Sequence, residues 1–141
     1  MTRFDCTHIV LYSGHLPSTH DFYAGLLKCS VRVYNEEILG VDVGRLFINF
    51  YPAKVSSIQS SVNHLGLELP TRVSVEEWFT YLSGEGAALH LSRVQTKNRE
   101  RQSLRSLEQL QANQVSGPYR FYLIDPDGLW LELHTWEGAD F

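Results

Sequence analysis

The chain has 141 residues, with 12 basic and 16 acidic side chains and a formal net charge of −4. This length fits one compact domain, and the 43% share of hydrophobic residues excludes an intrinsically disordered chain. The acidic balance argues against nucleic-acid binding, and no apolar run approaches the ~20 residues that a membrane span needs. The N-terminus lacks a secretion signal and the two cysteines form no disulfide framework, so we expect a cytoplasmic protein.

The sequence repeats itself weakly at an offset of 56 residues. His8 aligns with His64, and the apolar residues that follow each histidine align as well. Each copy predicts a strand that starts at the histidine and then a helix capped by Ser18 or Ser74. In the second helix one apolar face is predicted, followed by an end at two glycines; these residues are Val75, Trp78, Phe79, Leu82, Gly84 and Gly86.

Three strands are predicted after each helix, at 30–34, 38–43 and 45–51 and then at 88–94, 119–124 and 129–135. The sequence Asp-Pro-Asp-Gly at 125–128 predicts a tight turn between the last two. The predicted fold is therefore α+β, with two tandem βαβββ modules that form curved mixed sheets around a metal-binding trough. Within a single domain of residues 1–141, the modules cover about 4–55 and 60–137.

An insertion at about 95–114 has no counterpart in the first module. Leucines at 104, 107 and 110 predict a short amphipathic helix within it. Two interpretations of this segment are open, a solvated surface insertion or a lid over an anionic substrate. The second rests on its basic side chains, Lys97, Arg99, Arg101 and Arg105.

Alternation along the strands predicts which side chains share a face of each sheet. Apolar residues occupy one face and polar or aromatic ones the other. If the sheets curl into a trough, its floor would hold His8, Asn49, His64 and Glu132. Two imidazoles and one carboxylate form a facial ligand set for a divalent metal, which leaves three octahedral positions for water or substrate.

Four segments together resemble the vicinal oxygen chelate superfamily: HIVLY at 8–12, DFYAGLL at 21–27, NHLGL at 63–67 and FYLIDPDGLWLE at 121–132. The superfamily includes glyoxalase I, fosfomycin-resistance and bleomycin-binding proteins and extradiol dioxygenases. The resemblance implies paired βαβββ modules and a divalent ion (Fe, Mn, Ni, Co or Zn) held by His8, His64 and Glu132. It also implies a homodimer whose sites are shared between chains.

The chain departs from individual members of the superfamily at one decisive position. By strand parity, either Asn49 or Tyr51 stands where glyoxalase I has a second glutamate, and Asn49 lies near where extradiol dioxygenases have a catalytic histidine. An amide is a poor general base, which weakens both reactions. The serine-rich loop of fosfomycin-resistance thiol transferases is not recognisable either.

Other polar and aromatic residues share the predicted trough face. As catalytic candidates we take Tyr122, His134 and Asn49, because each could bind or transfer a proton or orient substrate. The predicted substrate-binding residues are Phe47, Tyr12, Arg120, Trp130 and Glu68, while His15, His20 and His90 are placed off these faces.

The sequence thus predicts a divalent-metal-dependent enzyme of glyoxalase or dioxygenase type that acts on a small, oxygen-rich molecule chelated at the His-His-Glu site. Its reaction is left open. The alternatives are a metal-free drug-binding protein of bleomycin-resistance type and a fosfomycin-resistance-like thiol transferase.

Overall fold

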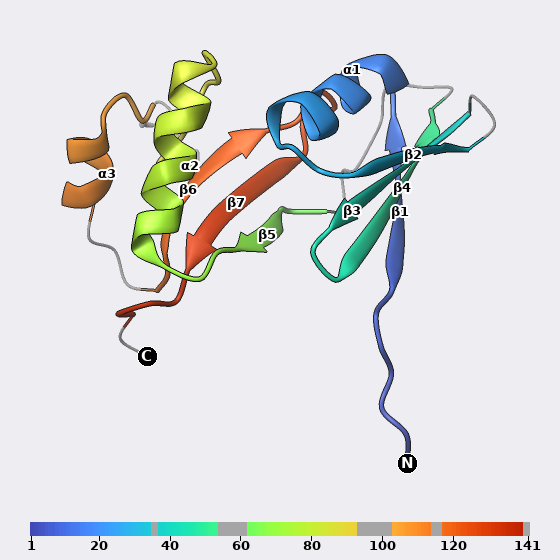
Figure 1. Cartoon of the computed structure of the whole chain (residues 1–141), viewed down its shortest axis with the longest axis horizontal. Coiled ribbons are helices and arrows are strands. Elements are labelled where there is room, and N and C mark those ends of the chain that lie inside the picture. Colours follow the sequence, from blue (N-terminus) through green and yellow to red (C-terminus); the bar gives the residue numbers. More distant parts are fainter. Residues whose placement is uncertain (35–36, 54–61, 93–102, 114–116, 140–141) are drawn as a thin grey trace. The chain divides into compact units, whose positions relative to one another are not determined.

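The computed structural model describes residues 1–34, 37–53, 62–92, 103–113 and 117–139 (Figure 1). The chain divides into two compact units, one of residues 1–61 with 126–128 and one of residues 62–125 with 129–141. In the described ranges no helix is long and apolar enough to cross a bilayer.

The first unit carries a four-stranded mixed sheet in the order β1-β4-β3-β2. Strand β1 pairs in parallel with β4, and the other two pairings are antiparallel. A short helix runs into a π-helical turn between β1 and β2. The elements are β1 (His8–Ser13), α1 (Leu16–His20), the π-helix η1 (Asp21–Leu26), β2 (Val31–Tyr34), β3 (Ile38–Val43) and β4 (Leu46–Pro52).

The second unit repeats this topology with a three-stranded sheet in the order β5-β7-β6. The parallel pair β5–β7 and the antiparallel pair β6–β7 correspond to β1–β4 and β3–β4 of the first unit. The expected α+β class with two mixed sheets is therefore confirmed. The elements are β5 (Leu65–Glu68), α2 (Arg72–Gly84), α3 (Leu107–Ala112), β6 (Tyr119–Ile124) and β7 (Trp130–Thr135).

The strand predicted at 88–94 does not form over its described part, residues 88–92. Only His90 pairs there, in isolated antiparallel bridges to Tyr122 and Ser103. Its backbone exchanges both hydrogen bonds with Tyr122 at 2.8 Å, while the Leu89 carbonyl accepts from the Leu104 amide. Pairing is thus split between a strand and a loop, so no continuous ladder develops; residues 93 and 94 lie outside the described ranges.

Both helix caps lie three residues before the predicted serine caps. The caps are His15 and Thr71, whose side chains accept from the backbone N–H groups of Ser18 and Ser74. A proline in the first turn of α1 needs no hydrogen-bond acceptor, which favours the earlier start there. The predicted caps were wrong, but the true caps are again 56 residues apart. The predicted end of α2 is confirmed at Gly84, with Gly86 at a φ of 79°.

Each sheet has one apolar face covered by its helix, as the strand alternation predicts. In the second unit α2 lies along β6 and β7 (Figure 1) and buries Val75, Phe79 and Leu82. The Phe79 ring meets the Phe121 ring edge-on, with the ring centroids 5.9 Å apart and the planes at 82°. The residues of β6 and β7 on this face are Phe121, Leu123, Leu131, Leu133 and Thr135, all buried. The opposite face is left for polar side chains.

The described part of the insertion packs against the second unit. The predicted short helix forms at Leu107–Ala112 with Leu110 buried, whereas Leu104 is buried in the segment before it. The Gln111 amide donates to Glu76 of α2. A purely solvated segment is therefore wrong for residues 103–113. Three of the basic residues behind the lid interpretation, Lys97, Arg99 and Arg101, lie outside the described ranges.

The turn at 125–128 forms as predicted. The Asp125 carboxylate accepts from the Leu129 amide at 2.9 Å, and Gly128 takes a φ of 86° that disfavours other residues. The Asp127 carboxylate accepts from the Gly14 amide and the Thr19 hydroxyl, which ties the turn to the start of α1.

Tyr119 gives a pH-dependent test of the packing of α2. Its hydroxyl donates to Glu76 at 2.9 Å, and burial, followed by this bond and the charge of Glu76, raises the pKa of Tyr119 well above its usual value near 10. A group whose pKa is raised by folding stabilises the folded state fully at pH values below its unfolded-state pKa. This stabilisation is lost as the pH rises from that value through the folded-state pKa. We expect Tyr119→Phe to lower the free energy of unfolding by about 1 kcal/mol at neutral pH.

The difference between wild type and Tyr119→Phe should shrink above about pH 10. Urea titrations at pH 7 and pH 10.5 measure it, with Tyr34→Phe, at an exposed tyrosine of β2, as the control. An equal difference at both pH values would contradict the assigned contact.

Candidate functional site

Glu132 places a carboxylate at the middle of the second sheet, on the face that α2 does not cover. In the ladder it lies between Gly66 of β5 and Tyr122 of β6. Its side chain is 9% exposed. A carboxylate so far removed from water needs hydrogen-bond donors or a cation beside it, and two histidines supply nitrogen atoms at this place.

His64, just before β5, directs one ring nitrogen at this carboxylate. Its Nε2 lies 3.5 Å from Glu132 Oε2, and its Nδ1 lies 2.7 Å from Asn63 Oδ1. The carboxamide oxygen can only accept, so Nδ1 carries the proton, and in the neutral imidazole Nε2 then offers a lone pair. A lone pair and a carboxylate oxygen at this separation repel unless a proton or a cation lies between them.

The first copy of the repeat also has a hydrogen-bonding side chain at Nδ1 of its histidine, here a hydroxyl that can donate or accept. His8 Nδ1 lies 3.1 Å from the hydroxyl of Thr7, the residue 56 positions before Asn63. In both copies the preceding side chain therefore binds Nδ1 and leaves Nε2 for another partner. Hydrogen bonding at one ring nitrogen is how proteins orient histidines that ligate metals through the other.

His134 lies on the other side of the Glu132 carboxylate, with Nδ1 at 3.2 Å from Oε1. Its side chain is 12% exposed. A Cβ atom added at Gly66 would come within 2.9 Å of its Cε1 atom, so the ring lies directly over the glycine. The two carboxylate oxygens thus face different histidines.

Three aromatic rings line the same face of the second sheet. Tyr122 is buried, and its ring centroid lies 6.2 Å from that of His64 and 6.1 Å from that of Trp130. His90, which the sequence led us to place off this face, lies with its ring centroid 5.3 Å from that of Trp130. Strand alternation did not predict this position, because His90 is placed by an isolated bridge to Tyr122 and not by a regular strand.

Arg120 and Glu68 flank His134 in the ladder. The Arg120 guanidinium lies 6.0 Å from the centroid of the Tyr122 ring, and within the described ranges no carboxylate is within 4.0 Å of it. Glu68 is exposed at the end of β5. The second unit therefore brings together seven predicted site residues on one sheet face: His64, Glu68, Arg120, Tyr122, Trp130, Glu132 and His134.

The other four predicted residues belong to the first unit, on the uncovered face of its sheet. His8 is exposed and opposite Phe47, whose ring lies over Gly40; Asn49 is opposite Val10. Tyr12 is 51% exposed. Whether His8 and Asn49 meet the residues of the second unit stays a prediction.

No group of three or more histidine, cysteine, aspartate or glutamate side chains in the described ranges is arranged to hold a metal ion. His64 and Glu132 nevertheless fit as a pair. Two ligand atoms at about 2.1 Å from one ion, at octahedral to tetrahedral angles, lie about 3.0–3.4 Å apart. The observed 3.5 Å is close to this range, and the donor set of a neutral imidazole and a carboxylate suits a divalent transition metal.

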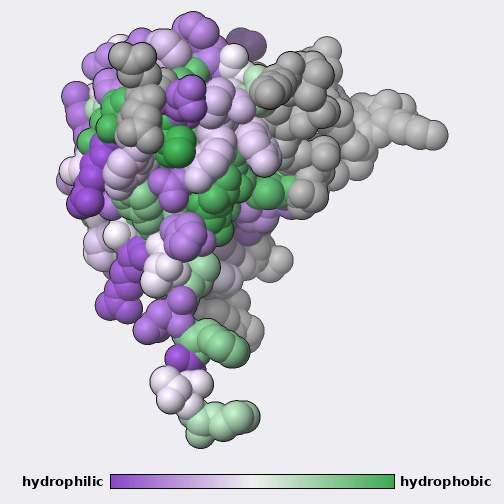
Figure 2. Space-filling view, turned by 90° about the vertical axis from the view of Figure 1, so that its right-hand side faces the viewer, coloured by the Kyte–Doolittle hydropathy of each residue, from purple (hydrophilic) through white to green (hydrophobic). Residues whose placement is uncertain are grey.

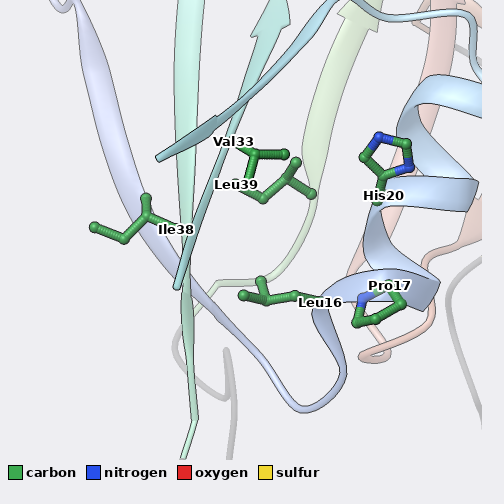
Figure 3. Close-up of a pocket in the computed structure, with 6 residues that line it drawn as sticks. All are labelled: Leu16, Pro17, His20, Val33, Ile38 and Leu39. Carbon is green, nitrogen blue, oxygen red and sulfur yellow. The ribbon is translucent and has the colours of Figure 1, made fainter. Parts of the chain in front are cut away.

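A pocket of about 220 Å³ lies on the helix side of the first sheet (Figure 3). Its lining is apolar apart from one imidazole, and the residues are Leu16, Pro17, His20, Val33, Ile38 and Leu39. None of the predicted site residues lines it. On the face shown in Figure 2, hydrophobic surface gathers in patches bordered by hydrophilic side chains.

Cys29 is a poor nucleophile in this fold. Burial, and then the nearby carboxylate of Asp42, raises the pKa of its thiol above the usual value of 9.0. A thiol with a raised pKa is mostly protonated near neutral pH and unreactive. The described site chemistry therefore rests on imidazoles, carboxylates and hydroxyls.

By sequence, the chain matches no protein-family model and no curated protein. Solved structures do match it. A lactoylglutathione lyase from Agrobacterium tumefaciens superposes with a TM-score of 0.67 at 16% identity, over 100% of both chains. A glyoxalase/bleomycin resistance protein/dioxygenase from Alicyclobacillus acidocaldarius gives 0.64 at 14% identity, over 93% of this chain and 90% of the other.

The chain has the glyoxalase/bleomycin-resistance/dioxygenase fold. An integron cassette protein from the mobile metagenome of V. cholerae also shares it, with a TM-score of 0.64 at 18% identity over 96% of this chain and 98% of the other. The expected resemblance to the vicinal oxygen chelate superfamily is thus confirmed at the level of the fold.

Asn63 tests how His64 is oriented. Asn63→Ala removes the acceptor at Nδ1, so the ring can place its proton on Nε2 and donate to Glu132 instead. A hydrogen bond worth about 1 kcal/mol shifts the tautomer ratio about fivefold. Nitrogen-15 NMR of the His64 ring measures this ratio in metal-free protein.

Asn63→Asp keeps the acceptor and should keep the wild-type tautomer. If Asn63→Ala leaves the ring-nitrogen shifts of His64 unchanged, then Asn63 does not set the tautomer and this description of the site is wrong.

Proposed function

We propose that this protein is a divalent-metal-dependent enzyme of glyoxalase or dioxygenase type that acts on a small molecule binding through two oxygen atoms. His64 and Glu132 would hold the ion together with His8, from the same chain or from a second copy in a homodimer. When bound, a divalent ion supplies Lewis-acid stabilisation of negative charge on substrate oxygens.

The observation that carries this proposal is the pairing of His64 with Glu132. Nε2 carries a lone pair because Asn63 accepts from Nδ1, and it faces a carboxylate oxygen 3.5 Å away. Such a pair needs a proton or a cation between its atoms, and a divalent ion meets that need. The same arrangement of Nδ1 at His8 supports His8 as a third ligand.

The chain's own residues give the substrate side of the site its character. Tyr122 and Trp130 form an aromatic wall beside Glu132, with Tyr122 buried and Trp130 half-buried. The Arg120 guanidinium suits an anionic substituent such as a carboxylate, which it can bind through two parallel hydrogen bonds. A small anionic molecule with neighbouring oxygens is the substrate class that these side chains favour.

Proton transfer, if the reaction needs it, falls to Tyr122 rather than to Asn49. A carboxamide neither accepts nor releases a proton near neutral pH, whereas the phenol of Tyr122 has an acidic proton and lies beside the imidazole of His64. This disfavours glyoxalase I chemistry, which needs a carboxylate base in the place of Asn49. Asn49 would orient substrate or water by hydrogen bonding.

A second candidate function is metal-free binding of an aromatic or apolar small molecule. The first unit favours it, because large side chains are exposed on the uncovered sheet face: Val10 at 43%, Tyr12 at 51% and Tyr51 at 39%. Such a protein would be stabilised against heat by hydrophobic ligands in the presence of a chelator. A thiol transferase stays a third possibility, which only an assay with a thiol cosubstrate addresses.

Elemental analysis tests the metal proposal directly. Protein purified without chelator or nickel resin, and reconstituted with each divalent ion, should hold close to one ion per site. Glu132→Gln and His64→Ala should lose at least nine-tenths of it. The matched control is Glu76→Gln, a half-buried glutamate of α2 on the other side of the sheet, which should retain the ion.

The identity of the ion then directs the search for the reaction. Iron would direct assays to catechol-like substrates under oxygen, and zinc, nickel or manganese to reactions without redox change. Wild type that stays metal-free after reconstitution, or Glu132→Gln that retains the ion, would refute the proposal and favour the binding protein.

A further inference from the structure

We infer that His134 is a positioning residue that holds the Glu132 carboxylate in the orientation a metal ligand needs, and that Gly66 is required to seat it. The inference rests on the proposed function of Glu132 as a ligand. It replaces the sequence-based expectation that His134 transfers protons.

The contact geometry shows which atom His134 acts on. Its Nδ1 lies 3.2 Å from Oε1 and hydrogen-bonds at 3.5 Å to the backbone carbonyl oxygen of Glu132, while the other carboxylate oxygen, Oε2, faces His64 Nε2 at 3.5 Å. A carboxylate can only accept, so Nδ1 carries the proton and donates. With Oε1 held by this donor, Oε2 is the oxygen presented toward the lone pair of His64.

Burial makes this orientation matter. The side chains of Glu132 and His134 are 9% and 12% exposed, so water has little access to replace the Nδ1 donor. Without His134 the carboxylate would lose its neighbouring donor and could rotate about its last side-chain torsion, which is a broad and soft one. A ligand that must first be oriented binds an ion more weakly, because the ordering costs entropy.

Gly66 provides the room for this contact. It lies beside Glu132 in the ladder, and a Cβ atom there would come within 2.9 Å of Cε1 and 3.5 Å of Nδ1 of His134. Real Cβ atoms essentially never approach that closely, so an alanine must push the imidazole away. The register thus places a residue without a side chain where the imidazole lies. Gly66→Ala therefore displaces the ring of His134 without removing its N–H donor.

Metal affinity measured with a competing chromogenic chelator and Zn²⁺ tests the inference. His134→Phe keeps a ring but removes the donor, and we expect Kd to rise 10- to 100-fold. His134→Asn keeps an N–H near the position of Nδ1 and should restore most of the affinity. Gly66→Ala should weaken binding in the same direction as His134→Phe, while Gly84→Ala, which meets nothing within 4 Å, should leave Kd unchanged.

A thermal double-mutant cycle in metal-free protein provides a readout that does not depend on the ion. If His134 contacts Glu132, the Tm losses of His134→Phe and Glu132→Gln will not add in the double variant, whereas residues without contact give additive losses.

The outcomes separate the inference from the proposed function. If the wild type binds Zn²⁺ and the Kd of His134→Phe is within twofold of the wild-type Kd, the inference is wrong but the proposed function stands. Additive Tm losses lead to the same conclusion. Wild type that binds no Zn²⁺ refutes the proposed function, and the inference falls with it. Non-additive Tm losses with weakened binding in His134→Phe and Gly66→Ala, and recovery in His134→Asn, support it.

Discussion

A carboxylate withdrawn from water is the constraint on which the open face of the second sheet depends. Glu132 sits at the centre of a three-stranded sheet, with leucines on either side of it in the chain buried on the opposite face. Its charge is tolerable only with partners, because an unmatched buried carboxylate costs several kcal/mol. His134, two residues further along the same strand, and His64, in the segment before β5, meet this need.

The neighbours of Glu132 on the adjacent strands follow from the register of the sheet. The parallel pairing of β5 with β7 sets Gly66 beside Glu132, and the antiparallel pairing of β6 sets Tyr122 on its other side. A shift of one residue in either strand would turn these side chains to the helix-covered face. The packing of Phe79 of α2 against Phe121 fixes that register from the apolar side.

Strand alternation and the 56-residue repeat predicted the class of fold and the strand faces, because apolar and polar residues alternate along each strand. The sequence Asp-Pro-Asp-Gly predicted the turn at 125–128. The helix caps were misplaced by one turn because serine is a good cap in isolation, whereas the chain uses His15 and Thr71. His90 was missed because an isolated bridge leaves no periodic pattern. The roles of Asn63 and Gly66 depend on ring orientation, which residue type and spacing do not encode.

The repeat extends to the way the two histidines are held. Thr7 and Asn63 occupy the same place in the two copies, and each binds Nδ1 of the histidine that follows it. If only the histidine mattered, the two copies would need to share that one side chain alone. Duplication of the histidine together with its orienting neighbour fits a site in which both Nε2 atoms serve the same purpose.

A crystal structure of the protein grown with Mn²⁺ or Zn²⁺, with anomalous scattering recorded at the metal edge, tests that purpose most directly. We predict an anomalous peak within bonding distance of His64 Nε2 and Glu132 Oε2, with the imidazole of His8 as a further ligand and His134 Nδ1 on Oε1. A structure in which the ion is absent from Glu132, or in which Nε2 of His64 donates a hydrogen bond to the carboxylate instead, would contradict it.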